Sequence, residues 1–357
     1  MSRSWRETAL TKRLGLRVPI VLGPFGGASS VELTGAVSNA GGLGSYGLYG
    51  MDASRIAEVG RQLHAATDGP FALNLWLPLG EDARPNASEY VAFLHVLEPY
   101  FAELGLPLPE RPDRYLVPFD EQIDAAIEAA PAALSFVYGV PDAALIQRCR
   151  DAGILVIGTA TTVDEARALS IGGADAIVAT GFEAAGHRVS FLSPAEDSLV
   201  GTIALVPRVV DAVDVPVIAA GGIADGRGVA AALALGASAA QLGTAFLACD
   251  ESAANPAHRA RLWSDAAEDT VLTSVFSGRL SRGIPNRMSR ELGEVAGTLA
   301  PFPVQNWLTG HLKRAAAASG NPDFTSLWAG QAAALITHRH AAELIEAIER
   351  TVDELAG

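Results

Sequence analysis

Short apolar runs alternate with longer segments of helical periodicity along most of the chain. Each run is nearly continuous in apolar and small residues, which is typical of parallel strands buried on both faces. We identify eight such runs, at residues 19–25, 43–48, 71–77, 132–139, 154–160, 175–181, 215–222 and 238–247. A helix-like segment follows each run except the last.

Eight strand–helix units over roughly 230–250 residues predict an α/β protein with a (β/α)8 TIM barrel. A doubly wound sheet is the alternative. That fold usually has fewer strands and needs a glycine-rich fingerprint loop early in the chain, so the pattern favours the barrel.

Two stretches depart from this rhythm. Residues 78–118 are rich in proline and hold one helix-like piece, so we expect an insertion after strand three. Residues 251–357 predict a helical C-terminal segment, with helices near 255–265, 306–320 and 340–357. The expected organisation is therefore a barrel in two parts, 1–77 and 119–250, with the insertion and the C-terminal segment packed together beside it.

Composition narrows the class of protein. The chain has 357 residues, 49% of them hydrophobic, which suffices for one large core. The formal net charge is −14 and no Lys/Arg cluster is present, so we expect no nucleic-acid partner. No apolar run is long enough to span a bilayer, and the N-terminus lacks the apolar core of a signal peptide. We expect a cytoplasmic monomer or homodimer with no membrane partner.

His187 is the candidate catalytic residue. It lies in the glycine- and alanine-rich stretch 182–191, which predicts a loop, six residues beyond the sixth strand run. Active sites of TIM barrels lie at the C-terminal ends of the strands, so His187 should face a ligand there. A lone histidine is more often structural, and this alternative stays open. For Glu183 and Arg188 we expect a structural role, in which Arg188 caps the loop or pairs with Glu183.

The loops after strands seven and eight predict an anion site. They read AAGGIADG (219–226) and QLGTAF (241–246). Gly221 and Gly222 let backbone N–H groups approach an anion closely, and Gly243 with Thr244 adds bare backbone and a hydroxyl donor. Two such loops side by side suit a phosphate monoester, although ordinary barrel turns also favour glycine.

Strand ends one and three add further candidates. Asn74 carries both donors and acceptors and can read the edge of a heterocycle. Phe25 and Trp76 can flank a flat ring or pack in the core. No group of His, Cys, Asp and Glu has the spacing of a metal site, so we expect no metal.

Four segments together resemble the nitronate monooxygenase family, formerly called 2-nitropropane dioxygenases. They are ELTGAVSNAGGLGSYG (32–47), FALNLWLP (71–78), LSFVYGVP (134–141) and GTATTVDEARALSIGGADAIVATGFEAAGHR (158–188). The segment SGRLSRGIPNRMSREL (277–292) is similar to the family's post-barrel region. The family often has methionine at Phe25, glutamine at Thr180 and glycine at Ala185.

The resemblance implies an FMN enzyme that oxidises alkyl nitronates with O2 to a carbonyl compound and nitrite; use of neutral nitroalkanes stays open. His187 would hold the anion or take the α-proton of a nitroalkane. With Phe25 and Tyr138 it would line a small apolar pocket with few cations, of which Arg188 is the main one. The expected cofactor contacts are Gly23, Pro24, Phe25, Asn74, Thr180, Gly181, Gly186, Ala220, Gly221, Gly222, Gln241, Gly243 and Thr244.

Two other functions stay open. FMN-dependent NAD(P)H reductases of the enoyl-acyl-carrier-protein or quinone type share this barrel and a histidine in the same place, although LSFVYGVP favours the nitronate enzyme. A flavin-binding barrel without turnover is the remaining alternative, and His187 argues against it.

Overall fold

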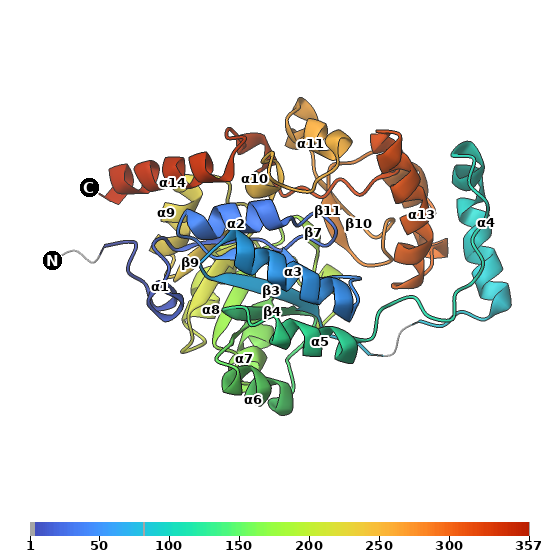
Figure 1. Ribbon diagram of the computed structural model, residues 1–357. Coiled ribbons are helices and arrows are strands. Elements are labelled where there is room, and N and C mark those ends of the chain that lie inside the picture. The colour runs from blue at the N-terminus through green and yellow to red at the C-terminus, as the bar shows by residue number, and fades with distance from the viewer. Residues whose placement is uncertain (1–3, 81–82, 357) are drawn as a thin grey trace.

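Eight parallel strands form the centre of the molecule in the computed structural model, which describes residues 4–80 and 83–356. They are β1 (Ile20–Leu22), β2 (Gly44–Gly47), β3 (Phe71–Trp76), β4 (Ala133–Val137), β5 (Leu155–Ala160), β6 (Ala176–Thr180), β8 (Val217–Ala220) and β9 (Ala239–Leu242). Their order is β1-β9-β8-β6-β5-β4-β3-β2, and a parallel bridge between Val21 and Leu43 joins the two ends. The predicted TIM barrel is confirmed (Figure 1).

Helices follow the strands on the outside of the barrel. They are α2 (Val31–Asn39), α3 (Ala53–Ala66), α5 (Phe119–Glu128), α6 (Ala143–Asp151), α7 (Val163–Ile171), α8 (Thr202–Val210) and α9 (Gly226–Ala234), with α1 (Ala9–Leu14) before β1. Several begin at a side chain that accepts a backbone N–H of the first turn, such as Ser30, Asp52 and Asp142. Residues 1–3 lie outside the described residues. They begin the N-terminal segment in which we expect no signal peptide.

The last barrel strand is shorter than its apolar run. We predicted strand over 238–247, but β9 ends at Leu242 and Thr244–Leu247 forms the helix α10. The N–H of Leu247 donates to the carbonyl of Gly243 at 2.9 Å, which is a helical bond. An apolar run that continues from a buried strand into a buried helix has no polar position to mark the boundary.

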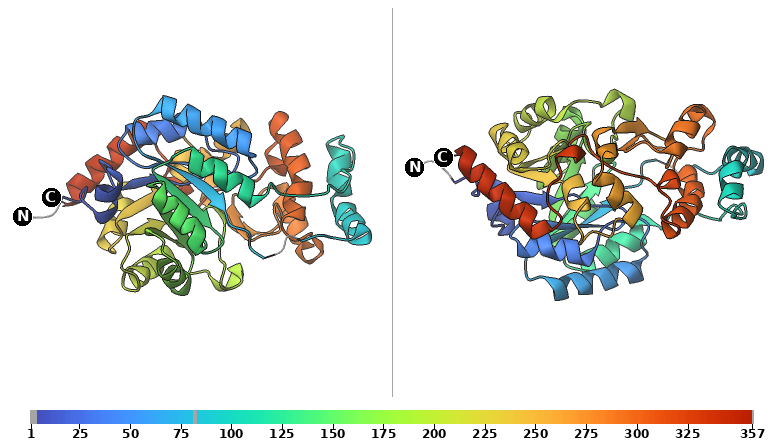
Figure 2. Two further views of the ribbon diagram at one scale, coloured as in Figure 1. Left: turned by 60° about the horizontal axis from the view of Figure 1, so that its bottom comes forward. Right: turned by 90° about the horizontal axis from the view of Figure 1, so that it is seen from above.

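The insertion lies on the side of the C-terminal segment that faces away from the barrel. Its helix α4 (Ala87–Glu103) packs against α13 (Val304–Ala318), and Leu97 and Phe101 share one buried cluster with Leu308. All three views place α13 between α4 and the barrel (Figures 1 and 2). The insertion therefore covers the outer face of α13. The opposite face of α13 lies toward the barrel.

The C-terminal segment holds the expected helices α11 (Pro256–Leu262), α13 and α14 (Ala341–Ala356), together with α12 (Arg287–Gly293). It also contributes two strands that local pattern did not indicate. These strands, β10 (Val271–Thr273) and β11 (Ser281–Gly283), form an antiparallel sheet with β7 (Gly186–His187). Part of the loop predicted around His187 is therefore the strand β7. The local sequence does not reveal this strand, because its partner β11 lies far along the chain. Within the described residues, no helix has the length and apolar character needed to cross a membrane.

Candidate active site

Strand β7 fixes His187 at the mouth of the barrel. Its backbone pairs with Ser281, and its imidazole Nε2 lies 2.8 Å from the hydroxyl of Ser277. Ser277 is buried, and its hydroxyl donates to the carbonyl of Arg279 at 3.2 Å. When Ser277 donates in this way, its oxygen accepts from Nε2–H, and Nδ1 keeps the imidazole lone pair.

Aromatic rings surround His187. Trp76 lies at a centroid distance of 5.1 Å in an edge-on arrangement, and Trp328 lies at 5.6 Å. Tyr138 follows at 5.1 Å from Trp76 and has a positive φ of 70°, a conformation that is rare for a bulky residue. The predicted neighbourhood of Tyr138 and His187 therefore exists in the structure, with Trp76 between them.

Arg279 is the first of two cations in this cluster. Its guanidinium carbon lies 4.2 Å from the ring centre of Tyr138 and 3.8 Å from that of Phe302. Such stacking orients the planar group and leaves its N–H donors at the edges. Among residues 4–80 and 83–356, no carboxylate forms an ion pair with Arg279.

Lys313 on α13 is the second cation. Its ammonium donates to Asn306 Oδ1 at 2.9 Å, and the Asn306 amide donates to the hydroxyl of Tyr49 at 2.8 Å. Tyr49 stacks on Trp76 at 4.3 Å, so this chain of contacts returns to the rings beside His187. Lys313 also has no carboxylate partner in the described part of the chain.

Burial and the two cations determine the charge of His187. Burial, together with the positive charges of Arg279 and Lys313, lowers its pKa to about 3. Burial also lowers the pKa of Lys313, to about 8, with a contribution from Arg314. At neutral pH the imidazole is therefore uncharged while Lys313 is largely protonated.

Arg188, which we expected to be the main cation of the pocket, binds backbone carbonyls instead. Arg188 is buried and donates to the carbonyls of Thr180, Gly181 and Ser198 at 3.1, 2.8 and 2.9 Å. Burial lowers its pKa to about 10, which still leaves it charged. Arg188 thus caps the end of β6, while the carboxylate of Glu183 accepts from the backbone and not from Arg188.

Replacing Arg188 with methionine is expected to lower the free energy of unfolding by about 2–4 kcal/mol, because the carbonyls that it binds would lose a charged donor. Urea unfolding followed by circular dichroism measures this loss. The control is Arg167→Met, which removes an exposed arginine from α7 and should leave the midpoint nearly unchanged. Equal midpoints for the two variants would contradict the capping role of Arg188.

The glycine loops come together at the ends of β1, β8 and β9. Gly221 and Gly222 have φ values of 101° and 70°, which only glycine adopts readily. A Cβ on Gly23 would lie 3.1 Å from the Cα of Gly243, so the loops after β1 and β9 touch. Thr244 accepts the N–H of Gly330 at 2.9 Å, which leaves its hydroxyl hydrogen available. The loops form a cradle of bare backbone with one hydroxyl.

The other expected cofactor residues occupy the same end of the barrel. They are Pro24 and Phe25 after β1, Asn74 in β3, Thr180 and Gly181 at the end of β6, Gly186 in β7, Ala220 at the end of β8 and Gln241 in β9. Asn74 is buried, and its amide donates to the hydroxyl of Ser135 at 2.9 Å. Phe25 lies beside Gly243, so it belongs with the glycine loops more than with Tyr138.

Sequence reasoning missed the part of the site that the C-terminal segment supplies, namely Ser277, Arg279, Phe302, Asn306, Lys313 and Trp328. The segment SGRLSRG was visible as a signal, since it carries both Ser277 and Arg279. Nothing in its local pattern shows that it reaches the barrel.

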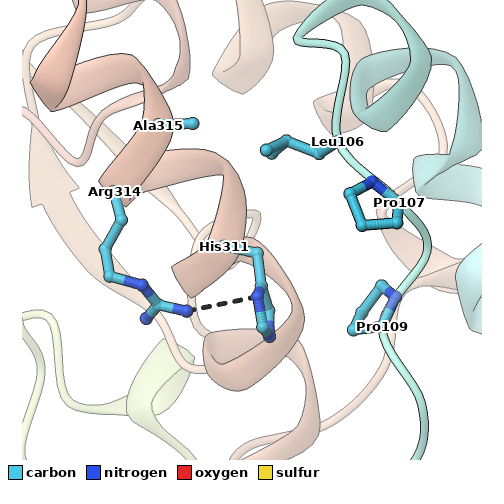
Figure 3. Close-up of a pocket in the computed structure, with 6 residues that line it drawn as sticks. All are labelled: Leu106, Pro107, Pro109, His311, Arg314 and Ala315. Atoms are coloured by element: carbon cyan, nitrogen blue, oxygen red, sulfur yellow. Dashed lines mark hydrogen bonds between the residues drawn. The ribbon is translucent and has the colours of Figure 1, made fainter.

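One surface pocket lies apart from this site. A surface pocket of about 470 Å³ opens between the insertion and α13, lined by Leu106, Pro107, Pro109, His311, Arg314 and Ala315 (Figure 3). In the part of the chain that the structure describes, no group of three or more His, Cys, Asp and Glu side chains is placed to hold a metal ion.

Comparison with known proteins agrees with this arrangement. The nitronate monooxygenase family profile matches residues 7–350. A Pseudomonas aeruginosa protein named nitronate monooxygenase is 42% identical over 351 residues, which are 97% of this chain and 99% of that protein. The structure of a nitroalkane oxidase from Streptomyces ansochromogenes superposes with a TM-score of 0.87 at 37% identity, covering 98% of this chain and 99% of its own.

FabK from Thermotoga maritima is also similar, with a TM-score of 0.76 and 30% identity over 98% of this chain and 97% of its own. The barrel and the polar cluster at its mouth define a TIM-barrel oxidoreductase. The chain belongs to the nitronate monooxygenase family, a flavin-dependent family of enzymes, so the alternative of a barrel without turnover falls away.

Proposed function

We propose that this enzyme oxidises alkyl nitronates with O2 to a carbonyl compound and nitrite, with FMN as cofactor. One observation carries the proposal: an uncharged His187 lies among aromatic rings beside two cations that have no carboxylate partner in the described chain. A nitronate is an anion with a short apolar chain, and such a site suits both of its parts. The names of the relatives support the same chemistry.

The glycine loops fit the phosphate of FMN. A dianion needs several N–H or O–H donors, and Gly222, Gly243 and Thr244, which follow the paired strands β8 and β9, provide bare backbone and a hydroxyl. With its amide engaged by Ser135, Asn74 keeps its carbonyl oxygen for a ring N–H. The bound flavin would supply the redox chemistry, taking up an electron from the substrate and passing it to O2.

A nitrite assay tests the proposed function. Purified, FMN-loaded protein is mixed in air with 2-propyl nitronate and no nicotinamide nucleotide, and nitrite and acetone are measured. We expect both products to accumulate over many turnovers. Parallel reactions with neutral 2-nitropropane show which ionisation state is used. Failure to release nitrite from the nitronate would refute the proposal.

Substitution in the phosphate loop should weaken FMN binding. In Gly222→Val the new side chain must adopt a φ of 70°, which β-branched residues avoid, so the loop would move. We expect the Kd for FMN to rise at least ~10-fold, equivalent to about 1.4 kcal/mol. The matched control is Gly153→Val, at a φ of 72° in the turn before β5. Flavin fluorescence quenching measures both, and equal affinities in the two variants would place the phosphate elsewhere.

The second candidate is an NAD(P)H-dependent reductase. It is favoured by the likeness to FabK and by the same two cations, since a pyrophosphate also requires positive charge. The two functions differ in the molecule that reduces the flavin.

A further inference from the structure

We propose that Arg279 and Lys313, here called the cation pair, bind the anionic end of the substrate and make the enzyme select the ionised nitronate over the neutral nitroalkane. The inference rests on the proposed function for the identity of the substrate. It assigns the binding of negative charge to two residues of the C-terminal segment and removes that task from His187.

The first argument is the lack of a counter-charge. Every other buried or half-buried cation near the mouth has its acceptors inside the protein; Arg188 binds three carbonyls and Arg282 donates to the carbonyl of Phe182 at 2.9 Å. Arg279 stacks between two rings, and Lys313 donates to one neutral amide. Holding two half-buried positive charges close to apolar rings without a counter-ion is unfavourable, and an incoming anion offsets that cost.

The second argument is the position of the pair around His187. Both charges act on the imidazole strongly enough to lower its pKa. The cation pair and His187 are also joined through neighbouring rings, since Trp76 contacts His187, Phe302 and Tyr49. An anion held by the pair would therefore lie next to a neutral imidazole that adds no charge of its own.

The third argument is shape. The guanidinium presents two parallel N–H donors in one plane, which match two oxygens on one atom. A nitronate carries such a pair of oxygens on its nitrogen. The rings of Tyr138 and Phe302 that hold Arg279 leave an apolar surround for the short alkyl chain. A neutral nitroalkane has the same shape without the charge, so the pair separates the two by electrostatics.

The test uses FMN-loaded protein and inorganic nitrate, a planar and unreactive anion. Nitrate is titrated by calorimetry and used as a competitor of 2-propyl nitronate. In Arg279→Met and in Lys313→Met we expect the nitrate Kd and the nitronate KM to rise at least ~10-fold, as expected for one charge-assisted hydrogen bond. The KM for neutral 2-nitropropane should change less than ~3-fold.

The control is Arg314→Met, which removes a positive charge from the next position of α13. Arg314 lines the outer pocket and bonds to His311 at 3.2 Å, away from the cluster (Figure 3). We expect its nitrate Kd to stay within ~2-fold of the unmodified enzyme. Lys313→Arg retains the charge and should recover most of the lost affinity, which a packing defect would not do.

Three outcomes would each overturn the cation pair. They are no competition between nitrate and nitronate in the unmodified enzyme, unchanged nitrate affinity in both methionine variants, and a loss in Lys313→Arg as large as that in Lys313→Met. The proposed function fails separately. If nitrate binds through the pair but the nitronate yields no nitrite, the pair stands and the reaction assignment falls. If nitrite forms with an unchanged KM in both methionine variants, the reaction stands and the pair falls.

Discussion

Replacing His187 with alanine is expected to lower the turnover of alkyl nitronate by about 10²–10³-fold while the protein keeps its flavin, since a preorganised polar group beside the reacting atoms is worth about that much. Strand β7 and the hydrogen bond to Ser277 hold the imidazole in one orientation. None of the glycine loops depends on this side chain, so flavin content and the unfolding midpoint should stay close to those of the unmodified enzyme.

One further variant separates the contribution of the imidazole from that of Ser277, which orients it, and a second serves as a histidine control. Ser277→Ala keeps the imidazole but removes the group that orients it, so we expect a loss of about 10-fold in kcat, smaller than that of His187→Ala. His64→Ala is the histidine control, because His64 lies on α3 and bonds to the carbonyl of Ala129. Near-normal kinetics in His187→Ala would show that the histidine is structural.

The pH profile gives an independent check. Because burial and the cation pair lower the pKa of His187 to about 3, the imidazole stays neutral as the pH falls from about 7 to about 5. Protonation of His187 should therefore cause no loss of kcat over this interval. A decline in kcat with an apparent pKa near ~6.5 that disappears in His187→Ala would contradict the neutral state.

The barrel was predictable because its signal is local. Each apolar run and each helical segment can be recognised by itself, and a repeated unit leaves few possible folds. The position of His187 at the mouth followed from the same count, since the fold rule places strand ends there. The glycine loops after β8 and β9 followed in the same way.

The rest of the site was hidden because it depends on contacts between distant segments. β7 exists only because Ser281 pairs with His187, and the C-terminal segment becomes part of the site through that pairing. The roles of the two arginines could not be separated by sequence. Arg188 adjoins the histidine but turns into the protein, while Arg279 lies far along the chain and reaches the cluster. A charge pattern shows how many cations exist, whereas only packing shows which ones lack an internal partner.

The substrate that reduces the flavin distinguishes the two candidate functions. The number of cations does not distinguish nitronate oxidation from NAD(P)H-dependent reduction, because Arg279 and Lys313 could bind either a nitronate or a pyrophosphate. Their surroundings favour the nitronate: Arg279 stacks on Tyr138 and Phe302, and Lys313 is linked through Asn306 to Tyr49, so we expect a small anion there, whereas a dinucleotide also needs room for two nucleosides. The insertion helix α4 packs against α13.

We therefore expect 2-propyl or ethyl nitronate to turn over in air without NAD(P)H, and anaerobic NADPH to bleach the flavin slowly or not at all. Stopped-flow absorbance of the FMN-loaded enzyme under anaerobic conditions compares the two reductants directly. The difference should be large, because the nitronate places its charge on the cation pair beside the reacting atoms. Arg279→Met should slow the nitronate reaction and leave the slow NADPH reaction as it was. If NADPH bleaches the flavin within seconds and the nitronate does nothing, the reductase function is correct and the oxidation of nitronates is not.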